Sequence, residues 1–233
     1  MVIPKKALKI FLIRLAIEGP WEKIFYVMGN HEYYGYVNNY IQLASCRRLP
    51  ALTFRSTGGS ERRAISDYQK LFIDTEYEHR IICIHHRYLV LDEFVLAGAT
   101  LWYDANYYNR NLSNDYNKIR GVRKKITPPE IRGLYSKDRN FLTDALTKPM
   151  EFLDSDMTER KKIVFMTHDP PLSQLDHHNE STNCWDLVDQ VDVWLYEHTH
   201  IPNEIVINDC MFRTNPLGYP GELKQNLGYI FEI

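Results

Sequence analysis

The chain has 233 residues, of which 44% are hydrophobic and 25% charged, so it has the composition of a globular protein and not of a disordered one. Its formal net charge of −2 gives no general attraction to nucleic acid or to anionic membranes, and no apolar run approaches the ~20 residues of a membrane span. The four cysteines contain no C-x-x-C pair, which argues against a zinc knuckle or a disulfide framework and favours a reducing, cytoplasmic setting.

The length fits a single domain over residues 1–233. The first element expected is an amphipathic helix over residues 5–17 that docks on the strand after it. Its predicted apolar face consists of Ala7, Leu8, Phe11, Leu12 and Leu15. The apolar run 24–28 then predicts a buried strand, which ends in the polar turn Gly29-Asn30-His31-Glu32.

Further strands are predicted over residues 80–84 and 94–102, the second of them interrupted by Gly98. Residues 105–135 are polar and contain Pro128-Pro129, so they predict an excursion over the surface, either a substrate-facing lid or a solvated loop. A helix is expected over residues 136–146. Its apolar face would be Phe141, Leu142, Ala145 and Leu146.

Two later strands repeat the design of the first. Residues 162–166 lead into Thr167-His168-Asp169, and residues 191–196 lead into Glu197-His198-Thr199-His200. A short helix at 184–188, a hairpin of 204–207 with 211–213 and a closing strand at 229–233 complete the pattern. This mixture of helices and strands indicates an α/β or α+β fold with a mixed sheet.

Histidines therefore follow three buried-looking strands, at the strand ends where α/β folds build their sites. The H-x-H spacing of His198 and His200 points both rings to one side of an extended backbone. Imidazole and amide groups suit Zn, Fe or Mn better than a thiolate site would. Each histidine alone could equally be a buried, hydrogen-bonded residue, but the three turns together predict a divalent metal site.

The motifs and their order resemble the calcineurin-like metallophosphoesterase superfamily, in its serine/threonine phosphatase-like branch. They are Gly29-Asn30-His31-Glu32, Gly98-Ala99-Thr100-Leu101-Trp102, Asn114-Asp115-Tyr116, Thr167-His168, His198-Thr199-His200 and Asn215-Pro216 with Gly218-Tyr219-Pro220. The resemblance runs from near Leu8 to the C-terminus. It implies a sandwich of two mixed β-sheets flanked by helices, and a pair of metal ions about 3.5–4 Å apart that activate water to hydrolyse a phosphate mono- or diester.

Carried over by motif, the resemblance implies that Asn30, His168 and His198 bind one metal and that His200 binds the other. His31 would be the catalytic residue beside the phosphate. Glu32 would orient His31 from behind. The expected partner is a phosphorylated substrate of unknown identity, and association with further copies of the chain stays open.

The sequence departs from the family pattern at its start, where the Asp-x-His and Gly-Asp motifs are lacking. The chain is therefore expected to begin just after these motifs and to lack the N-terminal strands that carry them. Glu197 stands where the family usually has glycine, and Asp169 where a second histidine is common. Glu197 could crowd the loop, or it could contribute a carboxylate that replaces in part what is missing. Glu197 and Asp169 are both hypothesised to support the remaining ligands and to compensate in part for the missing aspartates.

Three interpretations remain open at this stage. The first is a metal-dependent phosphoesterase, which the loss of the two motifs would impair. The second is a catalytically inactive remnant of the same fold that binds metal or another protein. The third is a mononuclear metal-binding protein that uses Asn30, His168 and His198.

Overall fold

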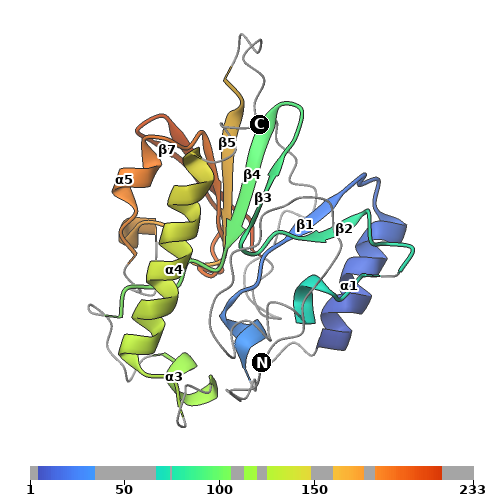
Figure 1. Ribbon diagram of the computed structural model, residues 1–233, viewed down its shortest axis with the longest axis horizontal. Helices are drawn as coiled ribbons and strands as arrows, with labels where there is room; N and C mark the ends of the chain where they lie inside the picture. Colours follow the sequence, from blue (N-terminus) through green and yellow to red (C-terminus); the bar gives the residue numbers. More distant parts are fainter. Residues whose placement is uncertain are drawn as a thin grey trace.

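Two β-sheets form the centre of the computed structural model, which describes residues 5–34, 67–73, 75–105, 113–119, 125–147, 160–175 and 182–216 (Figure 1). The smaller sheet pairs β1 (Ile24–Tyr26) in parallel with β2 (Ile81–Cys83). The larger has the strand order β3-β4-β5-β6-β8-β7. Its strands are β3 (Arg87–Val90), β4 (Phe94–Ala99), β5 (Lys162–Thr167), β6 (Val193–Leu195), β7 (Asn203–Ile207) and β8 (Cys210–Thr214).

Four neighbouring strands of the larger sheet, β4, β5, β6 and β8, run parallel to one another. The edge strands β3 and β7 are antiparallel to their neighbours. The described helices are α1 (Lys5–Glu18), α3 (Asp115–Lys118), α4 (Pro128–Thr147) and α5 (Trp185–Val188), with short 3-10 turns η1 (Asn30–Tyr33) and η3 (Ser173–Leu175). None of the helices in these ranges has the length and apolarity that crossing a membrane requires.

The two sheets pack face to face through one set of alternating side chains, because successive residues of a strand point to opposite faces. The smaller sheet and the residues after its strands contribute Phe25, Val27, Ile82 and Ile84 to this layer, and the larger sheet contributes Leu96, Val164, Met166, Val193, Leu195 and Met211. The uninterrupted apolar runs in these strands reflect burial on both faces.

Helices cover the outer face of each sheet. Leu12 and Ala16 of α1 pack against Tyr26, Ile81 and Cys83 of the smaller sheet. On the larger sheet, the outward-facing side chains join the apolar sides of α4 and α5, in a core that includes Leu142, Ala145, Phe165, Leu187, Val188, Trp194 and Phe212. The order of layers is thus helix, sheet, sheet, helix (Figure 1), which confirms the predicted sandwich of two sheets flanked by helices.

The first helix, α1, ends one residue later than predicted, and the face that it turns toward the sheet is shifted from the predicted apolar face. Phe11 is 44% exposed and Ala7 is exposed, whereas Leu12 and Ala16 are buried. The helix therefore faces the sheet through the stripe that contains residues 8, 12, 15 and 16. Ala16 is small, so the helix can lie close to β2 there. With this stripe against the sheet, Phe11 lies at the side of the contact between helix and sheet.

The predicted surface excursion was wrong over residues 128–135, because α4 begins at Pro128 and not near residue 136. Thr127 and Glu130 explain the start: the Glu130 carboxylate accepts hydrogen bonds from the Thr127 backbone N–H at 2.8 Å and from its hydroxyl at 2.6 Å. Proline is favoured in the first turn of a helix, where its missing N–H costs nothing. The Thr-Pro-Pro-Glu sequence is thus a helix start of the capping-box type.

Gly98 does not interrupt its strand, which runs unbroken from Phe94 to Ala99. A side chain at residue 98 would meet Val27 and Ile84 at 2.6 and 2.7 Å, so glycine is needed there for the two sheets to approach. β3 was not predicted, since its residues show little burial. The closing strand expected at 229–233 lies outside the described residues.

Candidate metal centre

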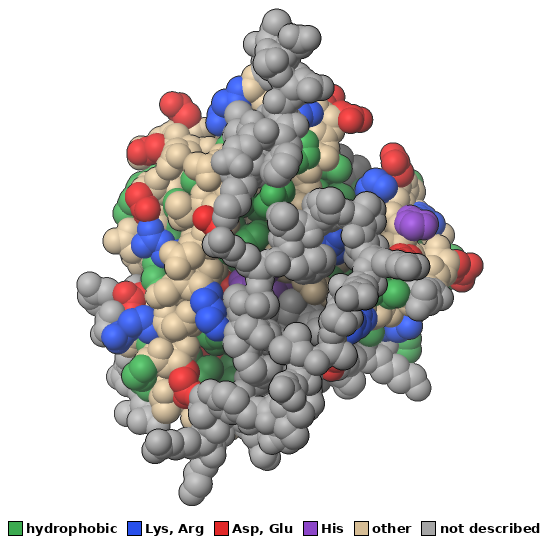
Figure 2. All heavy atoms as spheres, viewed as in Figure 1, with side chains coloured by type: hydrophobic (Ala, Val, Ile, Leu, Met, Phe, Trp, Pro, Cys, Tyr) green, Lys and Arg blue, Asp and Glu red, His purple; other side chains and the backbone are tan. Residues whose placement is uncertain are grey.

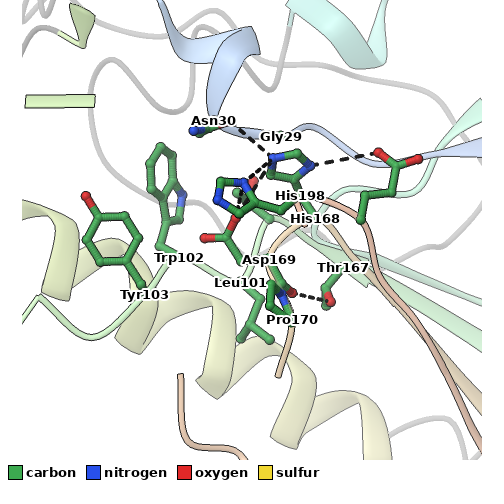
Figure 3. Close-up of polar contacts among 12 residues, drawn as sticks. Gly29, Asn30, Leu101, Trp102, Tyr103, Thr167, His168, Asp169, Pro170 and His198 are labelled. Atoms are coloured by element: carbon green, nitrogen blue, oxygen red, sulfur yellow. Dashed lines mark hydrogen bonds and ion pairs between the residues drawn. The ribbon is translucent and has the colours of Figure 1, made fainter. Parts of the chain in front are cut away.

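Three of the predicted turns meet at one place. His168 and Asp169 follow the end of β5, and His198 follows β6 by three residues, so both turns lie at the C-terminal edge of adjacent parallel strands. Asn30 arrives from the other sheet, in the turn η1 after β1. Figure 3 shows the two imidazole rings, the Asp169 carboxylate and the Asn30 amide turned toward one another.

The distances within this group are short. His168 Nε2 lies 3.1 Å from Asn30 Oδ1 and 3.1 Å from His198 Nδ1, and Asp169 Oδ1 lies 3.3 Å from His198 Nδ1. One ligand atom from each of His168, Asp169 and His198 falls within 4.8 Å of the others. Asn30 and Asp169 are buried, and both histidine rings are largely covered. We call these four residues the metal cluster.

The chemistry of the metal cluster fits a divalent transition-metal ion. Two imidazoles, a carboxylate and an amide oxygen are typical ligands of Zn, Fe and Mn. Asp169 was expected only to support the ligands, but its carboxylate lies among them and can contribute an oxygen. A cation at this point would also offset the negative charge of the Asp169 carboxylate and accept lone pairs from the neighbouring oxygen and nitrogen atoms.

Asp115 fixes the orientation of Asn30. Its Oδ1 accepts a hydrogen bond from Asn30 Nδ2 at 3.0 Å and another from the Tyr34 hydroxyl at 2.7 Å. With the amide nitrogen held in this way, the Asn30 oxygen faces His168. Asp115 belongs to the motif Asn114-Asp115-Tyr116, but its role could not be predicted, because nothing local to residue 115 shows that it reaches residue 30.

Gly29 allows the GNHE turn to approach the metal cluster. A Cβ atom at residue 29 would lie 2.7 Å from His168 Nδ1, so any side chain would strike the ring. The Gly29 backbone N–H donates to Glu32 Oε2 at 2.7 Å. This bond closes the turn, whereas Glu32 had been expected to orient the His31 ring. Burial, opposed by that hydrogen bond, raises the pKa of Glu32 to about 7.

His31 lies beside the metal cluster but is not part of it. Its half-buried ring packs against Tyr34, with ring centroids 4.7 Å apart. Burial, reinforced by the positive charge that His168 can carry, lowers the pKa of His31 to about 4. The His31 imidazole is therefore neutral at pH 7 and offers one N–H donor.

The H-x-H pair does not have the extended backbone that its spacing predicts. His198 and His200 have φ values of +68° and +56°, in the left-handed region, and the Thr199 N–H donates to the Glu197 carbonyl at 2.8 Å. The chain therefore turns sharply between the two histidines. His198 belongs to the metal cluster, and His200 lies outside the group of converging ligand atoms. Non-glycine residues held in this region are commonest at functional sites.

Glu197 lies on the solvent side of His168. Its Oε2 is 3.9 Å from His168 Nδ1, and its side chain is 67% exposed. Interaction with His168 holds the pKa of Glu197 below its ordinary value. Glu197 thus lies against the ring nitrogen of His168 that does not face Asn30.

The loop after β4 ties the turns together, and sequence reasoning gave it no role. The Thr100 carbonyl accepts the backbone N–H groups of His168 at 3.1 Å and of Asp169 at 2.9 Å. Its hydroxyl donates to the Met28 carbonyl at 2.7 Å. Thr100 thus links two strand ends: the end of β1, which leads to Asn30, and the end of β5, which leads to His168.

A second group of ligand-type residues, His85, His86 and Asp138, holds this loop from the other side. Asp138 Oδ2 accepts the Leu101 N–H at 2.7 Å, while its Oδ1 bonds to His86 Nε2. The His85 and His86 rings are stacked 4.4 Å apart, so their in-plane lone pairs do not converge on one point. Since the carboxylate is already bonded and the rings are parallel, we assign this group to supporting the loop.

Comparison with known proteins agrees with this architecture. The sequence profile of the calcineurin-like phosphoesterase family matches residues 3–202. The uncharacterized protein L509 of Acanthamoeba polyphaga mimivirus is 25% identical over 228 residues, which cover 87% of this chain and 70% of the viral protein. The crystal structure of phosphopantetheinyl hydrolase (PptH) from Mycobacterium tuberculosis superposes with a TM-score of 0.56 and 16% identity, over 93% of this chain and 74% of that one, and shows the same fold. This chain belongs to the calcineurin-like phosphoesterase family, a family of hydrolases.

Proposed function

We propose that this protein hydrolyses a phosphate mono- or diester with the help of a divalent metal ion held by the metal cluster. The observation that carries the proposal is the convergence of His168, Asp169 and His198 within 4.8 Å at the ends of adjacent strands, with Asn30 Oδ1 3.1 Å from His168. Such a set leaves coordination positions open for water and substrate. The family to which the chain belongs acts on phosphoesters.

A bound ion would polarise the phosphoryl oxygens and lower the pKa of a water molecule that attacks the phosphorus. The chain's own residues have separate tasks. Asn30, His168, Asp169 and His198 hold the ion, and Asp115 and Glu197 orient two of these ligands. His31, neutral and half-buried, donates its N–H to the phosphoryl group. A second ion bound through His200 remains a prediction, because His200 lies outside the cluster.

Metal binding is tested first, by calorimetric titration of the full chain with Mn²⁺ and with Zn²⁺. The His198→Ala variant should lose at least about tenfold in affinity, since a ligand is removed. His79→Ala is the matched control, because His79 is an exposed histidine outside the cluster and its loss should change nothing. The stoichiometry of the titration decides between one ion and two.

Turnover is tested with the Mn²⁺-loaded chain on aryl phosphate mono- and diesters and on a phosphopantetheinyl ester, the group that gives the structural relative its name. The His31→Ala variant should lose about 10²–10⁴-fold in kcat while it keeps its metal affinity. A chain that binds metal but turns over no ester above background with Mn²⁺, Fe²⁺ or Zn²⁺ would contradict the proposal and favour an inactive binding protein.

A further inference from the structure

Trp102 carries a buried polar group, the indole N–H, that is not accounted for by the contacts described above. Its side chain is fully buried, yet its indole N–H has no hydrogen-bond partner among the residues that the structure describes. Buried donors are almost always paired, because an unpaired one loses its bond to water on folding and gains nothing in return. Such a group calls for an explanation, and a bound molecule that supplies the acceptor is one.

The Trp102 ring is held firmly in place. Its backbone N–H and that of Leu101 both face Asp138 Oδ2, at 3.4 and 2.7 Å. Leu101 has a φ of +58°, a left-handed conformation that turns the chain just before the indole. The ring packs edge-on against Tyr33, with centroids 5.1 Å apart. The orientation of the indole is therefore set by contacts with two other segments, and not by its own N–H.

Trp102 belongs to the loop that touches the metal cluster. Two residues earlier, the Thr100 carbonyl binds the backbone of His168 and Asp169. Figure 3 shows the nitrogen-bearing edge of the Trp102 indole turned toward the side of His198 and Asp169. The unpaired donor thus points to the place where the proposed function puts the ion and its ligands.

Trp194 shows that this arrangement is not general for buried indoles in this fold. It is as completely buried as Trp102, but its Nε1 donates to Thr167 Oγ1 at 3.0 Å. The Trp194 donor is therefore satisfied by a hydroxyl that itself donates to the Asp169 carbonyl at 2.8 Å, and this paired indole offers a comparison for Trp102.

We propose that the Trp102 indole N–H donates a hydrogen bond to an oxygen of the phosphate group held at the metal cluster, an inference that rests on the proposed function. The indole N–H is a donor only, so its partner must supply an acceptor. A phosphoryl oxygen is such an acceptor, and its negative charge makes the bond stronger than one to a neutral group. Trp102 is thus a substrate-binding residue that recognises the phosphoryl group.

The experiment compares Trp102→Phe with Trp194→Phe and with the unaltered chain, each loaded with Mn²⁺. Binding of inorganic phosphate is measured by calorimetry, and unfolding by urea is measured without phosphate. Trp102→Phe should weaken phosphate binding about tenfold, as expected for loss of one hydrogen bond to a charged group. It should leave Mn²⁺ affinity unchanged, and the urea midpoint should fall much less than in Trp194→Phe, since no hydrogen bond of this indole to the described residues is broken.

Trp194→Phe should show the opposite pattern, with a lower urea midpoint and unchanged phosphate affinity, because it leaves the Thr167 hydroxyl without its donor. Equal phosphate affinity in Trp102→Phe and the unaltered chain would overturn the inference and leave the proposed function standing. A urea midpoint lowered as much as in Trp194→Phe would also overturn it, by showing a partner within the chain. If the unaltered, metal-loaded chain binds no phosphate, the proposed function fails together with the inference.

Discussion

At the scale of single residues, the geometry of the metal cluster depends on residues outside it. Gly29 leaves room for the His168 ring, and Asp115 holds the Asn30 amide with its oxygen toward the ring. Neither task is visible in local sequence, because each joins residues more than 80 positions apart. The meeting of Asn30, His168 and His198 was predictable, since imidazoles after buried strands are a strong pattern, whereas the place of Asp169 among them and the residues that position them were not.

Replacing Gly29 by alanine tests the steric argument. The backbone at residue 29 has φ −94°, which alanine adopts freely, so the only new element is a Cβ atom 2.7 Å from His168 Nδ1. The ring must move, and we expect metal affinity to fall at least about tenfold. Calorimetric titration with Mn²⁺ measures this effect, and an affinity equal to that of the unaltered chain would show that the ring can shift without cost.

Asp115 is tested by a pair of variants. Asp115→Ala leaves the Asn30 amide free to turn and should weaken metal binding about tenfold, because a positioning contact of a ligand is lost. Asp115→Asn keeps an oxygen that can accept from both Asn30 and Tyr34, and it should retain most of the affinity. Equal losses in the two variants would mean that the charge of Asp115, and not its geometry, matters.

At the scale of elements, the apolar runs and their order predicted most of the strands correctly, because strands buried on both faces are unmistakably hydrophobic. β3 was missed, since its residues are only partly buried. The predicted start of α4 was wrong because two prolines indicated a loop, although proline is favoured in the first turn of a helix. The backbone of the H-x-H turn could not be predicted, as its left-handed residues are not glycines.

The contact between the sheets can be tested at Gly98. Alanine there places a Cβ atom 2.6 Å from Val27 and 2.7 Å from Ile84, so the sheets must separate, and overpacking of this kind costs about 1–3 kcal/mol. The same substitution at Gly133, an exposed position of α4 with open space around it, should stabilise by about 0.5–1 kcal/mol. Urea unfolding measures both, and the two changes must have opposite signs.

At the scale of the whole molecule, one of the histidines that support the loop after β4 makes the free energy of unfolding depend on pH. His85 is completely buried, and burial holds its pKa well below the ordinary 6.5. Below pH 6.5 the unfolded chain therefore binds a proton at His85 that the folded chain does not. Folding stability must fall as the pH drops through this range, by up to about 1.4 kcal/mol per pH unit from this one residue.

The measurement is the free energy of unfolding in urea at pH 7.5, 6.5 and 5.5. His85→Gln should have a smaller decrease between pH 6.5 and 5.5 than the unaltered chain, because the titrating group is gone. His79→Gln removes an exposed histidine and serves as the control for the general effect of acid. An unaltered slope in His85→Gln would assign the acid sensitivity to other groups.

The hydrogen bond between Asn30 and His168 joins residues that are 138 positions apart. Contacts between residues so far apart in sequence are expected to form late in folding, because closing a large loop costs conformational entropy before the contact contributes any stabilising free energy. The metal cluster is therefore absent from the early encounters of the chain and complete only in the native state. An ion bound there would stabilise only the completed fold: it would lengthen the lifetime of the folded protein by slowing unfolding, and it would leave the rate of folding almost unchanged.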